Sequence, residues 1–422
     1  MAVSTGRPRR VVIVGGSISG LFHGVYLKRH GSDVVILEQD PKTIRSSHNA
    51  GIAIGPAALE FLAKYDDTGV QSCIPGVRTR LAYRQNLYWK DTNITKHLTS
   101  WGLLYRILRA NFDGLTSEAV PQPPKPRESD GKAEYRAGKR ATGLWYHDGV
   151  VTVQFVGEDG KEDRITADLV LGADGLHSTV KTLLAQATAK EYSGYVSWRG
   201  TINESELSPK TAEYFANRTV LGFYERNYFV CYPIPPDSGS FAPGTRLINW
   251  VWYWNMDESY ELDQVLTDIH GYKHSNTVPS GLINPEIWKK HLANTVPSLS
   301  PTFAELLLKT ENPFVTKVND AICERATYHD GHVILVGDAL STFRPHFALA
   351  TEQAAKHCLA LGKVWDGETT LEQWEKEAII WATKIRLGSR TMGAGHVRGW
   401  GEFFGAAWES LVFMVRAQLG WA

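Results

Sequence analysis

The stretch RRVVIVGGSISGLFHGVYLKRHGSDVVILEQD, residues 9–40, decides the class of fold. It opens with the unbroken apolar run 11–14, which is typical of a strand buried on both faces of a parallel sheet. A helical face follows, because apolar residues recur at intervals of three and four at Ile18, Leu21, Phe22 and Val25. A second apolar run ends at Glu38. The pattern predicts a strand, a turn, a helix and a strand in one α/β unit.

The turn of this unit has the composition of a dinucleotide site. Gly15 permits a tight turn, and Gly20 permits close packing of the helix on the strand. The helix N-terminus offers free N–H groups to a pyrophosphate, and Glu38 suits a ribose hydroxyl. Ser17 stands where the usual fingerprint has its middle glycine, but its side chain is small. Because strand, helix and acid are all present, we favour nucleotide binding over a tight turn without a ligand.

The bulk composition excludes several classes of protein. The 422 residues carry 45 Lys+Arg and 45 Asp+Glu, so no global field favours nucleic acid or an anionic membrane. The four cysteines are far apart, which predicts neither a metal site nor a disulfide framework and favours a reducing, cytoplasmic compartment. We find no signal-peptide pattern and no membrane-spanning run. We expect one large or two packed domains.

Two later apolar strands also end in acids. The run LVLGADG, residues 169–175, ends at Asp174, and HVILVGDA, residues 332–339, ends at Asp338. Asp338 is placed to bind hydroxyls of a ribose or polyol, and a helix is expected to begin near Ala350. Between these strands, aromatic runs in residues 192–254 predict a second, antiparallel sheet. Three strand-end motifs in this order point to one nucleotide site.

The order GGSISG, GADG and GDA resembles that of the single-component FAD-dependent aromatic hydroxylases, which share the p-hydroxybenzoate hydroxylase fold. The segments TSWGLLYRILRANF, YSGYVSWRG, YPIPP, NWVWY and GDALSTFRPH are similar to the branch that contains 2,6-dihydroxypyridine 3-monooxygenase. The resemblance implies an α/β protein. It would have a Rossmann-like FAD-binding domain, an inserted antiparallel β-sheet substrate domain and C-terminal helices.

The same resemblance divides the chain into alternating segments. The FAD-binding domain is expected in three parts, and the substrate domain in two. The FAD-binding parts are residues 1–75, 99–190 and 326–365; the substrate parts are 76–98 and 191–325; the C-terminal helices are 366–422.

The resemblance also implies roles for individual residues around FAD. Gly15, Ser17 and Gly20 would hold the pyrophosphate, and Glu38 the adenosine ribose. Asp174 is expected near the pyrophosphate and the transient NAD(P)H site, and Asp338 on the ribityl chain. The isoalloxazine would be met by Arg45, Pro345, Ala350 and Thr351. The chain departs from the family pattern at three positions, Trp101 for an arginine, Ala350 for a glycine and Gln353 for a lysine.

The predicted substrate pocket combines histidines with the aromatic strands. His346 and His48 are the candidate bases for a phenol proton, because histidine titrates near neutral pH; each is otherwise a structural hydrogen-bonding residue. Trp198, Phe229, Tyr232 and Tyr253 are the candidate wall residues. Side chains alternate along residues 248–254. Asn249, Val251 and Tyr253 share one face, and Trp250, Trp252 and Trp254 share the other; the pattern does not say which face lines the pocket. Arg199 suits a substrate carboxylate, although a surface ion pair is the simpler expectation.

The expected activity is an FAD- and NAD(P)H-dependent monooxygenase. It would hydroxylate a phenolic or hydroxypyridine-like ring through a flavin C4a-hydroperoxide, with or without decarboxylation. An epoxidase or oxidative-rearrangement enzyme of natural-product biosynthesis, and a nucleotide-binding relative without turnover, remain as alternatives. The expected partners are a small aromatic substrate and molecular oxygen, without nucleic acid or membrane. The C-terminal stretch WGEFFGAAW is either a packing helix or the contact of a homodimer.

Overall fold

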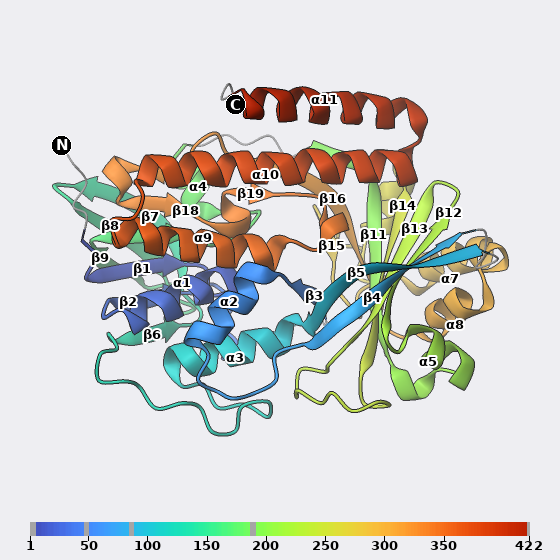
Figure 1. Cartoon of the computed structure of the whole chain (residues 1–422), viewed down its shortest axis with the longest axis horizontal. Helices are drawn as coiled ribbons and strands as arrows, with labels where there is room; N and C mark the ends of the chain where they lie inside the picture. Colours follow the sequence, from blue (N-terminus) through green and yellow to red (C-terminus); the bar gives the residue numbers. More distant parts are fainter. Residues whose placement is uncertain (1–5, 46–49, 84–87, 186–190, 420–422) are drawn as a thin grey trace.

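The computed structural model describes residues 6–45, 50–83, 88–185 and 191–419. Its elements form three sheets, with the helices packed around them (Figure 1). The α/β fold class, with its antiparallel substrate sheet and C-terminal helices, is confirmed.

The first sheet carries the opening strand–helix–strand unit. Its strands are parallel except for one short edge strand. In spatial order they are β17 (Thr327–Tyr328), β18 (Val333–Leu335), β10 (Leu169–Gly172), β1 (Arg10–Val14), β2 (Asp33–Leu37) and β6 (Ala133–Arg136). The central strand β1 is buried over Val11–Val14, as the apolar run predicts. Parallel pairing therefore brings the acids that follow β1's neighbours β2 and β10, and the next strand β18, to one edge of the sheet.

Helices pack against this sheet and against one another. Helix α1 (Ile18–Arg29) packs against α3 (Trp101–Asp113) and α9 (Ala350–Trp365), and α2 (Pro56–Tyr65) packs against α9. A separate antiparallel sheet adjoins strands β1 and β10 of the first sheet; it consists of β7 (Arg140–His147), β8 (Val150–Val156) and β9 (Glu162–Ala167). The sequence pattern does not predict this small sheet as a unit.

The large sheet has ten strands and separates two cores. Along it lie β15 (Thr277–Val278), β16 (Phe314–Ile322), β11 (Glu191–Asn203), β14 (Leu247–Asn255), β13 (Asn227–Ile234), β12 (Arg218–Tyr224), β4 (Ile74–Tyr83), β5 (Tyr88–Ser100) and β3 (Gly51–Ile54), with β19 (Ser341–Thr342) paired to β16. One face packs against α5 (Pro209–Phe215), α6 (Tyr260–Val265), α7 (Pro285–Thr295) and α8 (Pro301–Lys309). The other face looks toward the first sheet.

Strand β3 links the two halves of the protein. It lies within the segment 1–75 that we assigned to the FAD-binding domain, yet it pairs with β5 at the edge of the large sheet. The chain then passes through α3 to the first sheet, and it crosses to the large sheet again at β11. The crossings lie near the predicted domain boundaries, which themselves stay a prediction.

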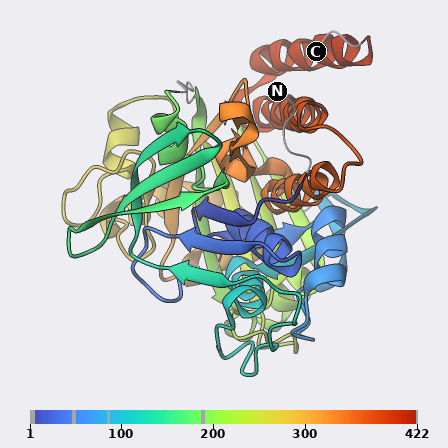
Figure 2. The same cartoon turned by 90° about the vertical axis from the view of Figure 1, so that its left-hand side faces the viewer.

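The chain ends in stacked helices on one side of the molecule. Helix α10 (Leu371–Gly393) runs over α9, a π-helical turn (Ala394–Arg398) follows, and α11 (Trp400–Gln418) lies outside α10 (Figures 1 and 2). None of the helices in the described part of the chain is long and apolar enough to cross a membrane.

Candidate active site

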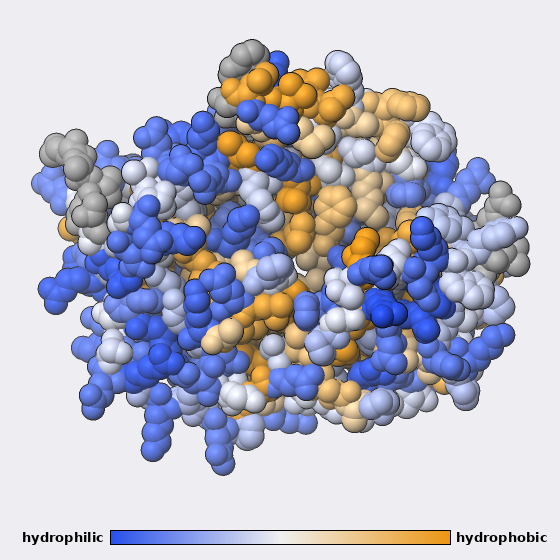
Figure 3. Space-filling view, in the orientation of Figure 1, coloured by the Kyte–Doolittle hydropathy of each residue, from blue (hydrophilic) through white to orange (hydrophobic). Residues whose placement is uncertain are grey.

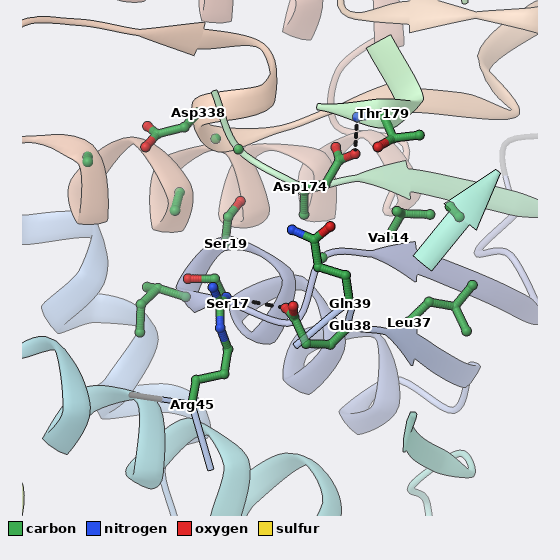
Figure 4. A pocket seen from close by; sticks show the side chains of 18 of the residues that line it. Val14, Ser17, Ser19, Leu37, Glu38, Gln39, Arg45, Asp174, Thr179 and Asp338 are labelled. Carbon is green, nitrogen blue, oxygen red and sulfur yellow. Dashed lines mark hydrogen bonds and ion pairs between the residues drawn. The ribbon is translucent and has the colours of Figure 1, made fainter. Parts of the chain in front are cut away.

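A cavity of about 310 Å³ lies at the edge of the first sheet where the acids meet. It lies among β1, β2, β10 and β18, and the N-terminus of α9 points into it (Figure 4). Eight of the ten predicted cofactor residues line it: Gly15, Ser17, Glu38, Arg45, Asp174, Asp338, Ala350 and Thr351. Gly20 and Pro345 lie just outside, the first under the turn and the second ahead of α9.

The turn between β1 and α1 leaves no room for larger residues. Gly15 has φ +106°, and a Cβ there would lie 2.5 Å from the Ala173 carbonyl oxygen. A Cβ on Gly20 would lie 2.0 Å from the Gly15 carbonyl oxygen. Ser17 is the N-cap residue of α1 in extended conformation, but its side chain makes no capping hydrogen bond. Its hydroxyl is therefore not committed to the helix.

Glu38 fastens the turn from the second strand. Its carboxylate accepts hydrogen bonds from the backbone N–H groups of Gly16, at 2.9 Å, and Asp40, at 2.8 Å. Arg45 pairs with the same carboxylate at 3.2 Å and lies 5.7 Å from the centre of the Trp101 ring. The aromatic residue that replaces the family's arginine at position 101 thus supports a cation at position 45.

Two polar groups in this cavity have no hydrogen-bond partner in the described part of the chain. The Asp338 carboxyl is partly buried, and this burial raises its pKa to about 6. The Ser19 hydroxyl is buried and also makes no hydrogen bond there. Buried polar groups normally have partners, so these two fit a ligand that brings hydroxyl donors and acceptors, such as the ribityl and phosphate parts of FAD. The cavity residues therefore fit the predicted cofactor.

Asp174 has a second task besides lining the cavity. Its carboxylate accepts from the Ser178 hydroxyl at 2.5 Å and from the N–H groups of Thr179 and Val180 at 2.6 and 3.1 Å. It therefore fixes the first turn of the short helix α4 (Thr179–Leu183). Burial nevertheless raises its pKa.

The segment before α9 runs between the large sheet and the cofactor cavity, and it contains several of the predicted site residues. Pro345–Phe347 form a 3-10 turn, and Ala348 adopts a left-handed conformation with φ +55°. This places His346 under the sheet while Ala350 and Thr351 line the cofactor cavity. One short segment therefore joins the two parts of the site.

The structure identifies which face of the aromatic strands looks toward the cofactor. Tyr253 and Tyr232 lie on that face, and Asn249 beside them accepts a hydrogen bond from the Gly51 N–H of β3 at 2.9 Å. Trp198 and Phe229 lie on the opposite face, in the core against α7 and α8. The assignment of those two residues to the substrate wall is therefore corrected, because strand alternation points them away from the cofactor cavity.

His346 is held between two tyrosines. Its Nε2 lies 2.6 Å from the Tyr195 hydroxyl, and its Nδ1 is hydrogen-bonded to the Tyr228 hydroxyl. Burial lowers the pKa of His346 well below its usual value, and the positive charge of Arg344 adds to this. The imidazole is therefore neutral, so one tyrosine donates to it and the other accepts from it. The second predicted base, His48, lies outside the described residues.

A polar cavity of about 470 Å³ begins behind this trio. Ser193 and Arg344 line it, and both act on the pKa of the neighbouring Tyr195 hydroxyl. Exposed acids such as Glu258 form its outer part. The cavity is therefore open to solvent on one side and is lined on the other by two residues, Ser193 and Arg344, that neighbour Tyr195.

Two hydrogen-bond donors on the cofactor-facing side of the sheet remain unused among the described residues. They are Nε of Arg199 and Nδ2 of Asn249, both buried. The positive charge of Arg199 reaches the hydroxyls of Tyr232 and Tyr253 and opposes the rise in their pKa that burial causes. The simpler expectation of a surface ion pair for Arg199 is wrong for the described part of the chain.

Sequence reasoning missed several residues that line the cofactor cavity. They are Ser19, Gln39, Lys139, Arg140 and Thr179. Ser19 and Gln39 directly neighbour the predicted residues of the first unit, so their position in the motif was an available signal. Lys139 and Arg140 come from the edge of the small sheet, and only the tertiary fold brings them here.

Comparisons with known proteins agree with this geometry. The FAD binding domain-like family matches residues 192–320. The 2,6-dihydroxypyridine 3-monooxygenase of Paenarthrobacter nicotinovorans is 29% identical over 87% of this chain and 86% of its own. The solved 2,6-dihydroxypyridine-3-hydroxylase of Arthrobacter nicotinovorans superposes with a TM-score of 0.77 at 27% identity, over 93% of this chain and 94% of that one. A salicylate hydroxylase substrate complex shares the fold, with a TM-score of 0.67 at 17% identity over 98% and 95% of the two chains.

The fold and the cavity together define a flavoprotein that binds FAD. The chain is similar in sequence and fold to the FAD-dependent aromatic hydroxylases, and it is an FAD-dependent monooxygenase of the aromatic-hydroxylase type. Monooxygenases of this family typically draw reducing equivalents from NAD(P)H.

Proposed function

We propose that this protein hydroxylates a small phenolic or hydroxypyridine-like ring. One ring C–H becomes C–OH, one oxygen atom comes from O₂, and the other leaves as water while NAD(P)H and a proton are consumed. The observation that carries this proposal is the junction at residues 345–351. It connects the cofactor cavity to a sheet face with unused donors and a buried tyrosine–histidine trio. The 2,6-dihydroxypyridine and 6-hydroxynicotinate 3-monooxygenases among the relatives support the choice of ring.

The cofactor residues keep their predicted roles in this proposal. The turn at Gly15, Ser17 and Gly20 holds the pyrophosphate, Glu38 the adenosine ribose and Asp338 the ribityl chain. Arg45, Pro345 and the first turn of α9 at Ala350 and Thr351 surround the isoalloxazine, where N–H groups and the helix dipole favour a reduced, anionic ring. Held by these residues, FAD would supply the redox chemistry that activates O₂.

The tyrosine–histidine trio moves the proton of the substrate hydroxyl. A hydroxylated ring is most reactive as its anion, so removing this proton lowers the barrier to oxygen transfer. Both nitrogens of His346 already contact tyrosine hydroxyls, so we assign it the middle of a relay, not direct contact with substrate. A proton taken up through Tyr228 leaves through Tyr195 to the polar cavity as His346 exchanges one tautomer for the other.

The unused donors indicate the chemistry of the substrate's substituents. Arg199, Asn249, Tyr232 and Tyr253 present a guanidinium, an amide and two hydroxyls, and burial holds the pKa of Tyr232 at about 12. Because this set is rich in donors, we propose a ring with an anionic oxygen, either a carboxylate or an ionised hydroxypyridine.

Epoxidation of a large apolar substrate is the second reading. Zeaxanthin epoxidase of Spinacia oleracea is 22% identical over 92% of this chain, which spans about half the length of that enzyme. The buried donors Arg199 and Asn249 would stay unpaired against an apolar chain, at a cost of roughly 1–3 kcal/mol each. This favours ring hydroxylation.

The test starts with the absorbance spectrum of the desalted protein and of its heat-released supernatant. We expect flavin bands that pass into the supernatant as FAD. NAD(P)H oxidation is then followed with a panel of hydroxybenzoates, hydroxypyridines and polyenes, with product and CO₂ measured. Ring-dependent oxidation with a hydroxylated product supports the proposal. Bound FAD without ring-dependent oxidation would favour a relative that has lost turnover.

Besides NAD(P)H and a proton, the proposed reaction needs the ring substrate and O₂. We propose a reducing, cytoplasmic location, since the four cysteines are all free and buried. We also propose that the protein forms a homodimer.

A further inference from the structure

The turn that precedes helix α9 contains a strained residue. Pro345–Phe347 form a single 3-10 turn, and α9 begins at Ala350. Between these two helical segments Ala348 has φ +55°, in the left-handed region that residues other than glycine rarely adopt. Strained backbone of this kind persists only where the surrounding structure holds it. The contacts around Ala348 must therefore stabilise the kinked conformation.

The left-handed residue keeps the 3-10 turn and α9 apart. With Ala348 in the right-handed region the two segments could join into one helix, and the carbonyl groups of residues 346–348 would accept from the N–H groups of residues 350–352. In the structure these three N–H groups have no acceptor among the described residues, and α9 makes its first backbone hydrogen bond from Gln353 to Leu349. The kink therefore leaves the first turn of α9 open toward the cofactor cavity.

Three contacts from different elements hold the kinked turn. The ring of His346 is bound by its two tyrosines on the large sheet. The ring of Phe347 packs against α10, where a Cβ on Gly388 would lie 3.3 Å from it. The carbonyl of Phe347 accepts a hydrogen bond from Nζ of Lys96, on β5, at 3.1 Å. Of the three contacts, only the bond from Lys96 acts on the main chain of the turn.

Lys96 has no acidic partner in the described part of the chain. Its strand places it opposite Val77 and on the same side of the sheet as Leu98, which shares an apolar cluster with the cofactor-facing Tyr232. Lys96 is partly buried, and burial lowers the pKa of its ammonium group, with no carboxylate nearby to oppose this. Figure 3 shows apolar side chains gathered between the two halves of the molecule. In such surroundings a charged donor binds a carbonyl strongly.

The Phe347 carbonyl has one other route to a partner. Lys96 is its only hydrogen-bond donor among the described residues. Without that donor, the N–H of Thr351 lies four residues further along the chain, and a helix that continued through Ala348 would bring the two groups together. The turn would then satisfy its own carbonyl by extending α9 backwards. The extended helix would use up N–H groups that now face the cofactor cavity.

We propose that Lys96 is a positioning residue that holds the kink at Ala348 and so keeps the first turn of α9 open for the isoalloxazine. This rests on the proposed function for the identity of the bound ring, whereas the two backbone states of the turn do not depend on it. Loss of the lysine would let residues 345–365 form one helix. That helix would cover the free N–H groups and draw His346 away from its tyrosines.

The test compares the full-length wild type, freed of FAD, with K96M by hydrogen exchange and by FAD titration. Exchange at residues 350–352 should slow in K96M, because these amides gain acceptors. The dissociation constant for FAD should rise at least about tenfold, as for the loss of a charge-assisted hydrogen bond. K96R should behave like the wild type, since a guanidinium also donates to a carbonyl. K90M is the matched control, an exposed lysine of the same strand, and should change neither quantity.

Variants of Ala348 test the same kink from the other side. Glycine adopts the left-handed region freely, so K96M/A348G should bind FAD within about threefold of the wild type. Valine resists this region, so A348V should show the slower exchange and the weaker FAD binding with Lys96 intact. The A348V and A348G variants keep the test available even where K96M does not fold.

Two sets of results would overturn the proposal. One is FAD binding by K96M equal to that of the wild type. The other is faster exchange at residues 350–352 in K96M, or weak FAD binding that A348G does not recover, because both indicate general loosening of the turn. None of these measurements uses a ring substrate, so a failure of ring hydroxylation and a failure of this proposal are distinguishable.

Discussion

At the scale of single residues, the cofactor cavity contains one carboxyl, that of Asp338, for which the described residues of the folded protein provide no hydrogen-bond partner. Burial raises the pKa of Asp338 to about 6, against 3.8 for the free group. The unfolded state therefore loses this proton more easily, so the apoprotein is destabilised as pH rises from about 4 to 6, and the penalty stays above that range.

The prediction is that D338N stabilises the apoprotein at pH 7 by on the order of 3 kcal/mol. The gain should vanish below pH 4, while FAD binding weakens at least tenfold. Urea unfolding of both apoproteins across pH, with flavin titration at pH 7, measures both effects. A D338N protein that is less stable at pH 7 and binds FAD normally would show that Asp338 has only a structural role.

His346 is predicted to act as a relay. In H346Q the amide cannot exchange its proton as an imidazole does, so we expect hydroxylation to slow by about 10–100-fold with FAD binding unchanged. Y195F should have a similar effect, because it cuts the path at the next group. Rapid-mixing kinetics at several pH values, with substrates of different hydroxyl pKa, provide the measurement. The greatest loss is expected for the least acidic substrate.

A partly buried histidine on the other side of the sheet, His291, serves as the control. Burial lowers the pKa of His291 to about 4, yet its ring packs against Trp198 and Trp252 in the core. H291Q should therefore lower stability without changing the dependence of rate on substrate pKa. Equal kinetic profiles for H346Q and H291Q would rule out the relay.

Arg199 is predicted to bind an anionic oxygen of the substrate. In R199Q we expect KM for a carboxylated ring to rise about 10–100-fold, since a charge-assisted hydrogen bond contributes about 1.5–3 kcal/mol. R199K should recover part of the loss because it restores charge without the planar fork. The matched comparison is the same ring without its carboxylate, for which KM should change little. A uniform loss for both rings would contradict this role.

At the scale of elements, the opening turn answers whether Ser17 is compatible with a dinucleotide. Ser17 makes no capping hydrogen bond and sits in extended backbone, so S17G should change stability by only a few tenths of a kcal/mol. In G20A the new Cβ meets backbone at 2.0 Å, so we expect a loss of about 1–3 kcal/mol and weaker FAD binding. Thermal unfolding with and without FAD compares the two. Equal behaviour would contradict the packing argument.

The elements also show what the sequence could predict. The strands before Glu38, Asp174 and Asp338 are local patterns, and parallel pairing then forces their ends together. The sequence could not predict which face of the aromatic strands looks toward the cofactor cavity. Alternation places Tyr253 and Trp252 on opposite faces but does not say which of them faces the cavity. Lys139 and Arg140 were missed since they reach the cavity only through long-range packing. His346 was found next to Pro345, but its tyrosine partners lie more than a hundred residues away.

At the scale of the whole molecule, the site exists because two sheets are joined by short segments. Strand β3 brings Gly51 against Asn249, and residues 345–351 bring His346 beneath the large sheet. A crossing of this kind cannot be read from either sheet alone. It explains why the cofactor residues could be predicted from local motifs, whereas the substrate side required the structure.

The most direct test of ring hydroxylation is product analysis under ¹⁸O₂. The FAD-loaded protein would be supplied with NAD(P)H and a panel of hydroxypyridines and hydroxybenzoates, and products would be examined by mass spectrometry. We predict a product whose ring carries one ¹⁸O atom, formed in step with NAD(P)H oxidation. NAD(P)H oxidation that yields only hydrogen peroxide, with no labelled ring product across the panel, would contradict the proposed function.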